Sequence, residues 1–452
     1  VYARILFDRK EYDKAAPIVG QLVKADAGNA KVQMLNAMLL ADTGKPDEAL
    51  ALMKKSGKDN PDSIQIQLLL ARTALQKNDI QTAETAWHQV EKLNPGNIEA
   101  SNGLAQIAIS RNDAGTLIDI AQKTIQAQPN YLAPYVWRGM GEVSRKEYDV
   151  AEADYQKAIK ASPQTSIAYL ELAQLRILQG RVPEAKTLLQ TALDKDANSG
   201  RALGVLVAYD MMAKQPDKAV ARIQAQIAKS PNNSNFYVQL ANIQLRTKDS
   251  KGALDSAQKA MQLAPKSEDA LAIYSQALVA MGNVDAAVST WQNWLNTHPK
   301  DTSATNVLGS LEEAKGDQQK AMEMYKKTLT LDSTDAVASN NLAYLMVENG
   351  QNVDVALSLA QAARRGKPDS PQTADTLAWV YYYKGNYLSA RDLLELALKD
   401  NPNNDSIHFH LGMTYAKLDR KADAATELKK AAALDPASKV AHDANDELAK
   451  LK

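Results

Sequence analysis

The chain has 452 residues and no cysteine, and its 53 Lys plus Arg balance 53 Asp plus Glu, so the formal net charge is zero. A balanced charge excludes the basic field on which nucleic-acid binding depends, and the lack of cysteine excludes disulfides, thiolate metal sites and a cysteine nucleophile. No apolar run approaches the roughly 18 residues that a membrane helix needs. We therefore expect no nucleic-acid partner and no membrane span in this chain.

The first segment, residues 1–29, is expected to be a partial unit that lacks the start of its first helix, because the chain begins in the middle of a repeating pattern. An incomplete unit leaves its neighbour's apolar side uncovered, which favours self-association through the ends of the array. The apolar residues expected on this end face are Ile5, Leu6, Ile18 and Leu22. A signal peptide upstream of Val1 is compatible with this start.

A period of 34 residues runs along the rest of the chain. Each period closes on a proline or a small residue, at Ala27, Pro61, Pro95, Pro129, Pro163, Ala197, Pro231, Pro265, Pro299, Ser333, Pro368, Pro402 and Pro436. One interval has an extra residue, expected in a loop near Gln351–Asp354. The period predicts twelve tandem units over 30–438, at 30–63, 64–97, 98–131, 132–165, 166–199, 200–233, 234–267, 268–301, 302–335, 336–370, 371–404 and 405–438.

Two small residues recur within each unit. One set lies twelve positions before the closing residue, at Ala15, Ala49, Ala83, Leu117, Ala151, Ala185, Ala219, Ala253, Ala287, Ala321, Ala356, Ala390 and Ala424. The other lies about twelve positions earlier, at Ala3, Ala37, Ala71, Ala105, Gly139, Ala173, Val207, Ala241, Ser275, Gly309, Ala343, Ala378 and Gly412. Antiparallel helices approach closely only where facing side chains are small. Leu117 breaks this rule, so we expect its helix pair to be displaced relative to the others.

Turn and cap residues divide each unit into two helices. A Gly or Asn between the small residues tolerates the left-handed conformation that ends a helix, at Gly44, Asn78, Asn112, Gly180, Gly282, Gly316, Gly350 and Gly385. Residues that cap a helix N-terminus lie two positions after the closing residue in every unit except at Tyr131. Each unit is therefore predicted to be a helical hairpin, and residues 439–452 are predicted to form a polar capping helix.

This pattern of small residues, turn residue and closing proline is most complete in two segments, LAWVYYYKGNYLSARDLLELALKDNP (377–402) and LGMTYAKLDRKADAATELKKAAALDP (411–436). Their length, small anchors and closing proline resemble the tetratricopeptide repeat family, in particular its long bacterial arrays. The resemblance covers almost the whole chain. It implies an all-α fold, a right-handed superhelical α-solenoid of about 13 helix-turn-helix repeats. It also implies a concave groove that is lined by the first helix of each repeat and that binds protein partners.

Catalytic signatures are absent from the sequence, with no phosphate-binding GxxxxGK[ST], GxGxxG, HExxH or GxSxG motif. His408 and His410 are two positions apart on a predicted helix, about 200° around its axis, so they cannot share a metal ion. We expect one of them to pack or line the groove and the other to be exposed. The chain is therefore predicted to be no enzyme and to hold no cofactor and no metal.

Helical spacing, combined with the geometry that the family resemblance implies, selects candidate partner-binding residues on the groove face of the first helices. They are Arg72, Asn242, Arg246, Asn306, Asn340, Tyr344, Asp375, Trp379, Tyr383, Phe409 and Met413. Aromatic rings beside Asn and Asp suit an extended peptide or a sugar chain, although tyrosine is also ordinary in the packing of such repeats. Replacing Trp379 and Tyr383 by Ala is expected to weaken partner capture without unfolding.

These features predict a non-catalytic protein–protein interaction scaffold. Long cysteine-free arrays of this composition resemble those of bacterial envelope assembly and exopolysaccharide export, so the expected location is the periplasm or the cell surface, with the cytoplasm as alternative. Two other readings stay open. The chain could be a structural protein that stacks head-to-tail into filaments, or the regulatory part of a larger enzyme.

Overall fold

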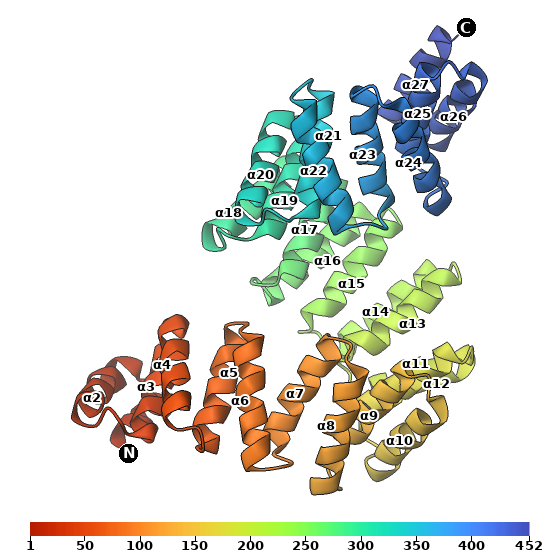
Figure 1. Cartoon of the computed structure of the whole chain (residues 1–452). Coiled ribbons are helices and arrows are strands. Elements are labelled where there is room, and N and C mark those ends of the chain that lie inside the picture. The colour runs from red at the N-terminus through yellow and green to blue at the C-terminus, as the bar shows by residue number, and fades with distance from the viewer. Residues whose placement is uncertain (452) are drawn as a thin grey trace. The chain divides into compact units, whose positions relative to one another are not determined.

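The computed structural model describes residues 1–451, which form 27 α-helices and contain no β-strand (Figure 1). The helices pair into antiparallel hairpins of nearly constant size, a first helix of mostly 13 residues and a second of 14. The shortest first helix is α1, with seven residues. The fold is an α-solenoid of helix-turn-helix repeats, in agreement with the fold class predicted from the sequence.

The chain divides into two compact units, an N-terminal unit (Val1–Pro231) and a C-terminal unit (Asn232–Lys452), which are described separately. The N-terminal unit contains α1 (Tyr2–Asp8), α2 (Tyr12–Ala25), α3 (Ala30–Asp42), α4 (Pro46–Asp59), α5 (Ile64–Gln76), α6 (Ile80–Leu93), α7 (Ile98–Ser110), α8 (Ala114–Ala127), α9 (Ala133–Ser144), α10 (Tyr148–Ala161), α11 (Ser166–Leu178), α12 (Val182–Lys195), α13 (Gly200–Met212) and α14 (Pro216–Lys229). The C-terminal unit contains α15 (Ser234–Arg246), α16 (Ser250–Leu263), α17 (Glu268–Ala280), α18 (Val284–Thr297), α19 (Thr302–Ala314), α20 (Gln318–Leu331), α21 (Ala336–Glu348), α22 (Val353–Gly366), α23 (Pro371–Tyr383), α24 (Tyr387–Asp400), α25 (Asp405–Lys417), α26 (Lys421–Leu434) and α27 (Lys439–Lys450).

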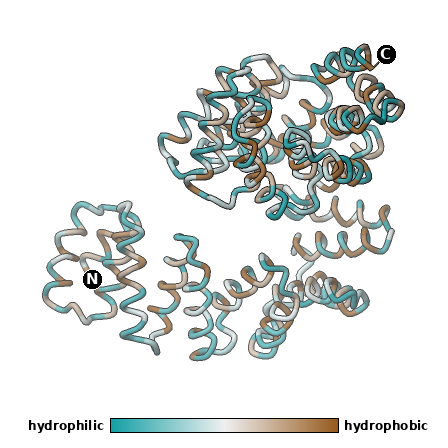
Figure 2. The backbone as a smooth tube through the Cα atoms, turned by 45° about the horizontal axis from the view of Figure 1, so that its top comes forward, coloured by the Kyte–Doolittle hydropathy of each residue, from teal (hydrophilic) through white to brown (hydrophobic). Residues whose placement is uncertain are grey.

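Packing within each unit is local in sequence. Every helix contacts the helices before and after it, and first helices also contact the first helix of the next repeat, as α21 does with α23 and α23 with α25. Each repeat thus buries its apolar stripe against its neighbours, which is how a solenoid forms a continuous core. Apolar and polar stretches alternate along the helices (Figure 2). No helix in the described chain is both long enough and apolar enough to cross a membrane.

The small anchor residues lie where the paired helices cross, and all of them are buried. The alanines of the set from Ala15 to Ala424 have no exposed surface. Gly309 on α19 shows why size matters, because a Cβ added there would lie 2.5 Å from Cε1 of Tyr325 on the paired helix α20. Gly139 faces Tyr155 in the same way at 2.5 Å. A glycine in the first helix therefore makes room for a large ring in the second.

The turns inside the hairpins have the left-handed conformation that the sequence predicts, and they have it in more repeats than predicted. All eight predicted Gly and Asn residues have positive φ, from 53° at Asn112 to 84° at Gly316. The remaining five repeats place other residues in this left-handed conformation, which the sequence analysis did not foresee, at Lys10, Lys146, Lys214, Lys248 and Asp419. The extra residue in the unit of Gly350 lies in the following loop, since α22 begins three residues after this glycine and α24 begins two after Gly385.

The repeat that contains Leu117 differs from the others in its packing, while the predicted displacement of its helix pair stays a prediction. Its second helix, α8, packs more extensively on α9 of the next repeat than on its own partner α7, whereas the other second helices contact their own partners most. The following helix also starts differently. Leu132, without a side-chain cap, precedes α9, while the hydroxyl of Tyr131 donates a hydrogen bond to Oδ1 of Asn102 at 2.7 Å. The packing of α8 thus favours the following repeat, at the place where α9 also begins without a side-chain cap.

The contact between Gly309 and Tyr325 can be tested by substitution. Gly309→Ala should lower the free energy of unfolding by about 1–3 kcal/mol, because the new methyl group overpacks a buried ring. Gly20→Ala is the control, since nothing lies within 4 Å of the added Cβ on α2 and alanine should stabilise this helix by about 0.5–1 kcal/mol. Urea denaturation followed by circular dichroism measures both changes. Equal effects of the two substitutions would contradict the packing argument.

Candidate partner-binding face

The candidate site in the C-terminal unit is built from three positions, four residues apart, on successive first helices. The side chains at these positions, together with Glu313, are called the first-helix face. Its members are Asn306, Ser310, Glu313, Asn340, Tyr344, Glu348, Asp375, Trp379, Tyr383, Phe409, Met413 and the exposed Lys417, on α19, α21, α23 and α25. Contacts between these helices, rather than spacing alone, bring the side chains together.

Trp379 is the centre of the aromatic part of the face, and it is buried, with only 4% of its surface exposed. Its ring stacks on His410 at 4.0 Å and on Tyr382 at 4.5 Å between centroids, and Tyr383 packs edge-on at 5.3 Å. Phe409 lies further away at 6.4 Å. The expectation that Trp379 can be removed without consequence for folding is therefore corrected, because this ring holds neighbouring repeats together.

Tyr383 and Glu348 form the accessible edge of the aromatic cluster. Tyr383 has 46% of its surface exposed, and Glu348, the last residue of α21, is exposed as well. The indole Nε1 of Trp379 donates to Oε1 of Glu348 at 2.7 Å, and the hydroxyl of Tyr383 donates to the same oxygen at 3.1 Å. The carboxylate is thus held in place by two aromatic side chains, and its second oxygen has no hydrogen-bond partner in the described chain.

Asp375 is held in a similar way by a histidine. Its Oδ1 lies 2.7 Å from Nδ1 of His410, the residue that stacks on Trp379. His410 is buried, and His408 is buried too, with its Nδ1 2.5 Å from Oε2 of Glu427. The expectation that one of the two histidines is exposed is wrong, because both lie between helices that stack closely around α25.

The asparagines of the face are oriented by a relay of hydrogen bonds. Nδ2 of Asn340 donates to Oδ1 of Asn341, Nδ2 of Asn341 donates to the hydroxyl of Tyr325, and this hydroxyl donates to Oε2 of Glu313 at 2.5 Å. Asn306 likewise donates through Nδ2 to Oδ2 of Asp335 at 3.1 Å. The relay directs each amide nitrogen toward an acceptor, and the carbonyl oxygens of Asn306 and Asn340 are buried without a hydrogen-bond donor in the described residues.

Of the remaining predicted residues, Met413 joins this cluster and three others lie outside it. Met413 is half-buried on α25 and packs against the cluster around Trp379. Asn242 and Arg246 are exposed on α15 of the same unit, and Nδ2 of Asn242 donates back to the carbonyl of Val238 at 3.0 Å. Arg72 belongs to the N-terminal unit and forms a two-pronged ion pair with Glu99 on the next first helix. The structure therefore brings together the residues from Asn306 to Met413 and leaves these three outside.

A charge asymmetry, missed by the sequence analysis, distinguishes the two units. In the C-terminal unit, helices α17, α19, α21 and α23 contain no Lys or Arg. Their acidic residues are Glu268, Asp269, Glu312, Glu313, Glu348 and Asp375. Only Glu312 among them lies within ion-pair distance of a Lys or Arg, at 3.7 Å from Lys315. Counting charges by helix, rather than over the whole chain, would have revealed this pattern.

The first helices of the N-terminal unit pair their acids with guanidinium groups. Glu99 pairs with Arg72, Glu171 with Arg201 at 3.0 Å, and Asp210 with Arg222 at 2.7 Å. Because these pairs neutralise one another, the N-terminal unit has no comparable acidic face. The chain as a whole has a formal net charge of zero, but the acidic charge on these first helices of the C-terminal unit is not balanced locally.

The hydroxyl of Tyr344 is affected by the negative charges of acidic residues on three helices. Burial raises the pKa of its hydroxyl, and the negative charges of Glu348, Asp375 and Glu313 raise that pKa further. Burial likewise raises the pKa of Tyr383 to about 12, with the charge of Glu348 as the second cause. Carboxylates from α19, α21 and α23 therefore act on one place, which has an acidic and aromatic character.

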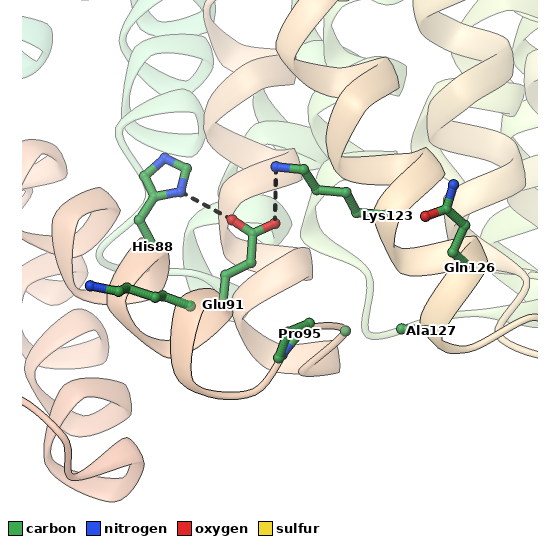
Figure 3. A pocket seen from close by; sticks show the side chains of 8 residues that line it. His88, Glu91, Pro95, Lys123, Gln126 and Ala127 are labelled. Atoms are coloured by element: carbon green, nitrogen blue, oxygen red, sulfur yellow. Dashed lines mark hydrogen bonds and ion pairs between the residues drawn. The ribbon is translucent and has the colours of Figure 1, made fainter.

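A hollow lies away from this face, on second helices of the N-terminal unit (Figure 3). It has a volume of about 540 Å³ and is lined by residues of α6 and α8 and the turn after α6. Nδ1 of His88 lies 3.3 Å from Oε2 of Glu91, whose other oxygen lies 3.8 Å from Nζ of Lys123. The Glu91 carboxylate there is already paired with His88 and Lys123. In residues 1–451, no group of three or more His, Asp or Glu side chains is placed to hold a metal ion.

The end face expected at residues 1–29 is only partly exposed. Ile5 and Leu22 have 42% and 38% of their surface exposed, but Leu6 is buried and Ile18 is half-buried. The prediction that Leu6 belongs to an exposed face is wrong, because this side chain packs with Phe7, Val19 and Leu35 into a local core. Self-association through this face stays a prediction.

The hairpins, their left-handed turns and a partner-sized face of first helices define a helical-repeat protein of the protein-interaction class. Family models agree. Tetratricopeptide repeat models match residues 6–73, 40–107, 142–208 and 376–439, and a model of the cytochrome c-type biogenesis protein H tetratricopeptide domain matches residues 221–336. The chain belongs to the tetratricopeptide repeat family. Comparison with curated protein sequences gave no match.

Comparison with solved structures gave similar chains at low sequence identity. The APC/C hetero-tetramer Cut9–Hcn1 matches with a TM-score of 0.46 and 16% identity, over 99% of this chain and 95% of that one. A tetratricopeptide repeat protein from Parabacteroides merdae matches with a TM-score of 0.44 and 20% identity, over 56% of this chain and 98% of that one. Naa15/Naa10 bound to HypK-THB matches with a TM-score of 0.34 and 14% identity, over 100% and 95%.

The burial of Trp379 leads to a test that separates packing from surface. Trp379→Ala should lower the free energy of unfolding by about 3–5 kcal/mol, since it removes a buried aromatic side chain that stacks on two others. Tyr383→Ala, at the exposed edge of the same helix, should cost about 1 kcal/mol or less. Urea denaturation followed by circular dichroism measures both. A Trp379→Ala protein as stable as the Tyr383→Ala protein would contradict the assignment of Trp379 to the core.

Glu142 on α9 gives a prediction for pH. Its side chain is buried beside the Arg138–Asp154 pair, so burial, and then the charge of Asp154, raise the pKa of Glu142 from 4.5 to about 7. The native state therefore binds more protons than the unfolded state between these values, and the contribution of Glu142 to stability should fall as the pH rises from about 4.5 to about 7.

Glu142→Gln should remove this slope and make the protein more stable than the wild type above neutral pH, because the amide needs no proton. Urea midpoints measured across this pH range test the prediction. Glu323→Gln, at an exposed position on α20, is the matched control and should leave the slope unchanged. An unchanged slope in the Glu142→Gln protein would show that another group titrates.

Proposed function

We propose that the chain is a non-catalytic scaffold that holds a segment of a partner protein on the first-helix face of its C-terminal unit. The observation that carries this proposal is the exposed edge formed by Tyr383 and Glu348. The two side chains are fixed by hydrogen bonds between neighbouring repeats, yet they remain accessible. Side chains that are ordered before binding lose little conformational entropy when a partner docks.

The chemistry of the face supports binding rather than turnover. Its titratable groups are single carboxylates that accept hydrogen bonds from Trp379, Tyr383, Tyr325 or His410. Nucleophilic catalysis requires a nucleophile in contact with a base, and no such pair belongs to the face. Aromatic side chains at its edge are instead the type that concentrates binding energy in protein interfaces.

As the setting we propose a bacterial envelope assembly or export system, in the periplasm or at the cell surface. The support for this setting is compositional, since a chain without cysteine suits an oxidising compartment. Measurement of the compartment in the native cell, by fractionation and immunoblotting, tests it. Recovery of the chain in the cytoplasmic fraction alone would overturn the envelope setting and leave the binding face untouched.

Site-specific photo-crosslinking tests the binding face. A photoreactive phenylalanine analogue at Tyr383, introduced into the full chain in native cells, should give discrete adducts with a partner protein. The same group at Leu388, which is 57% exposed on the second helix α24, is the control and should not give these adducts. Identical adducts from both positions, or none from Tyr383, would contradict the proposal.

A further inference from the structure

The acidic residues of the first-helix face raise the question of which ligand they would accept. Glu348 and Asp375 each use one oxygen to accept hydrogen bonds from aromatic or imidazole groups, and within residues 1–451 neither pairs with a Lys or Arg. Elsewhere the chain does pair such groups, as Glu99 and Arg72 show. Glu348 and Asp375 therefore lack the cation that neutralises comparable acids in the N-terminal unit.

The structure assigns to this face the binding of a basic segment of a partner protein, one that carries arginine or lysine. The inference rests on the proposed function and names the chemistry of the partner. Helices α19, α21 and α23 of this face contain acids and no Lys or Arg, while Lys417 lies at the far end, in the last turn of α25. A positively charged segment is therefore attracted to the part of the face around Glu348 and Asp375, and an acidic one is repelled. An anionic polysaccharide would be repelled for the same reason.

The edge at Glu348 has the parts that bind a guanidinium group. One carboxylate oxygen is held in place by Trp379 and Tyr383, and the second oxygen is unused. The half-exposed ring of Tyr383 lies next to it. A guanidinium group forms charge-assisted hydrogen bonds to a carboxylate and stacks on an aromatic face, and it carries donors but no acceptor. Arginine therefore fits this edge better than lysine, whose ammonium group cannot stack in this way.

A second carboxylate extends the site along the array. Asp375 lies on α23 and Glu348 on α21, and the negative charges of both raise the pKa of the Tyr344 hydroxyl on α21. Carboxylates on successive helices match an extended segment with more than one basic side chain, because each repeat then contacts a different part of the ligand.

Fluorescence anisotropy with the full chain tests the inference. The probes are three labelled Gly/Ser peptides of equal length that carry several arginines, glutamines or glutamates. The arginine peptide should bind, more weakly as salt is added, and the other two should not. Glu348→Gln with Asp375→Asn should weaken its binding about tenfold or more, because the substitutions remove both charges but keep the oxygens that accept the existing hydrogen bonds.

The matched control is Asp255→Asn with Glu323→Gln. It removes the same number of charges from exposed positions on the second helices α16 and α20 and should leave binding unchanged. Equal weakening by both pairs of substitutions would show non-specific attraction and overturn the inference. Binding of the glutamine or glutamate peptide as tightly as the arginine peptide would overturn it too. In either case, adducts from the photoreactive group at Tyr383 would still support the proposed function, so the two failures can be distinguished.

Discussion

The close approach of two antiparallel helices is the constraint on which the rest of this structure depends. Alanine or glycine at the crossings lets the backbones come together, and Gly309 leaves the space that the ring of Tyr325 fills. Hairpins built in this way stack on their neighbours within each unit through their apolar stripes. The helix of Leu117 differs from the other second helices, since it packs more on the following repeat than on its own partner. Small residues thus determine where every first helix presents its outer side chains.

Stacking of the repeats brings residues that are far apart in the sequence together on one face. Trp379, Glu348 and His410 come from three repeats and contact one another through stacking and hydrogen bonds. The same contacts that join the repeats therefore also order the polar groups at their edge. Packing and partner binding are not separate here, because a ring that is buried between repeats orients the carboxylate that remains accessible.

The sequence analysis succeeded where a residue acts within its own hairpin. The turn at Gly44 follows from the need for positive φ, whereas Lys10 adopts the same conformation with no local signal, because the flanking helices impose it. It was less complete where a residue acts between repeats. Spacing placed Trp379 on the partner-binding face but could not show that His410 and Tyr382 cover the ring. Glu348 was missed, because the last residue of a helix resembles any solvated glutamate.

By itself, the amino-acid sequence determined the 34-residue period, the hairpins with their caps and turns, and the family, since all of these depend on interactions within about one repeat. Only the tertiary structure decided which side chains of the first-helix face are accessible and which are buried. It also decided that Glu313, Glu348 and Asp375 converge on Tyr344 without a cation. The physical reason is that residues about 35 positions apart meet only when neighbouring hairpins stack, and their charges act on each other only at that distance.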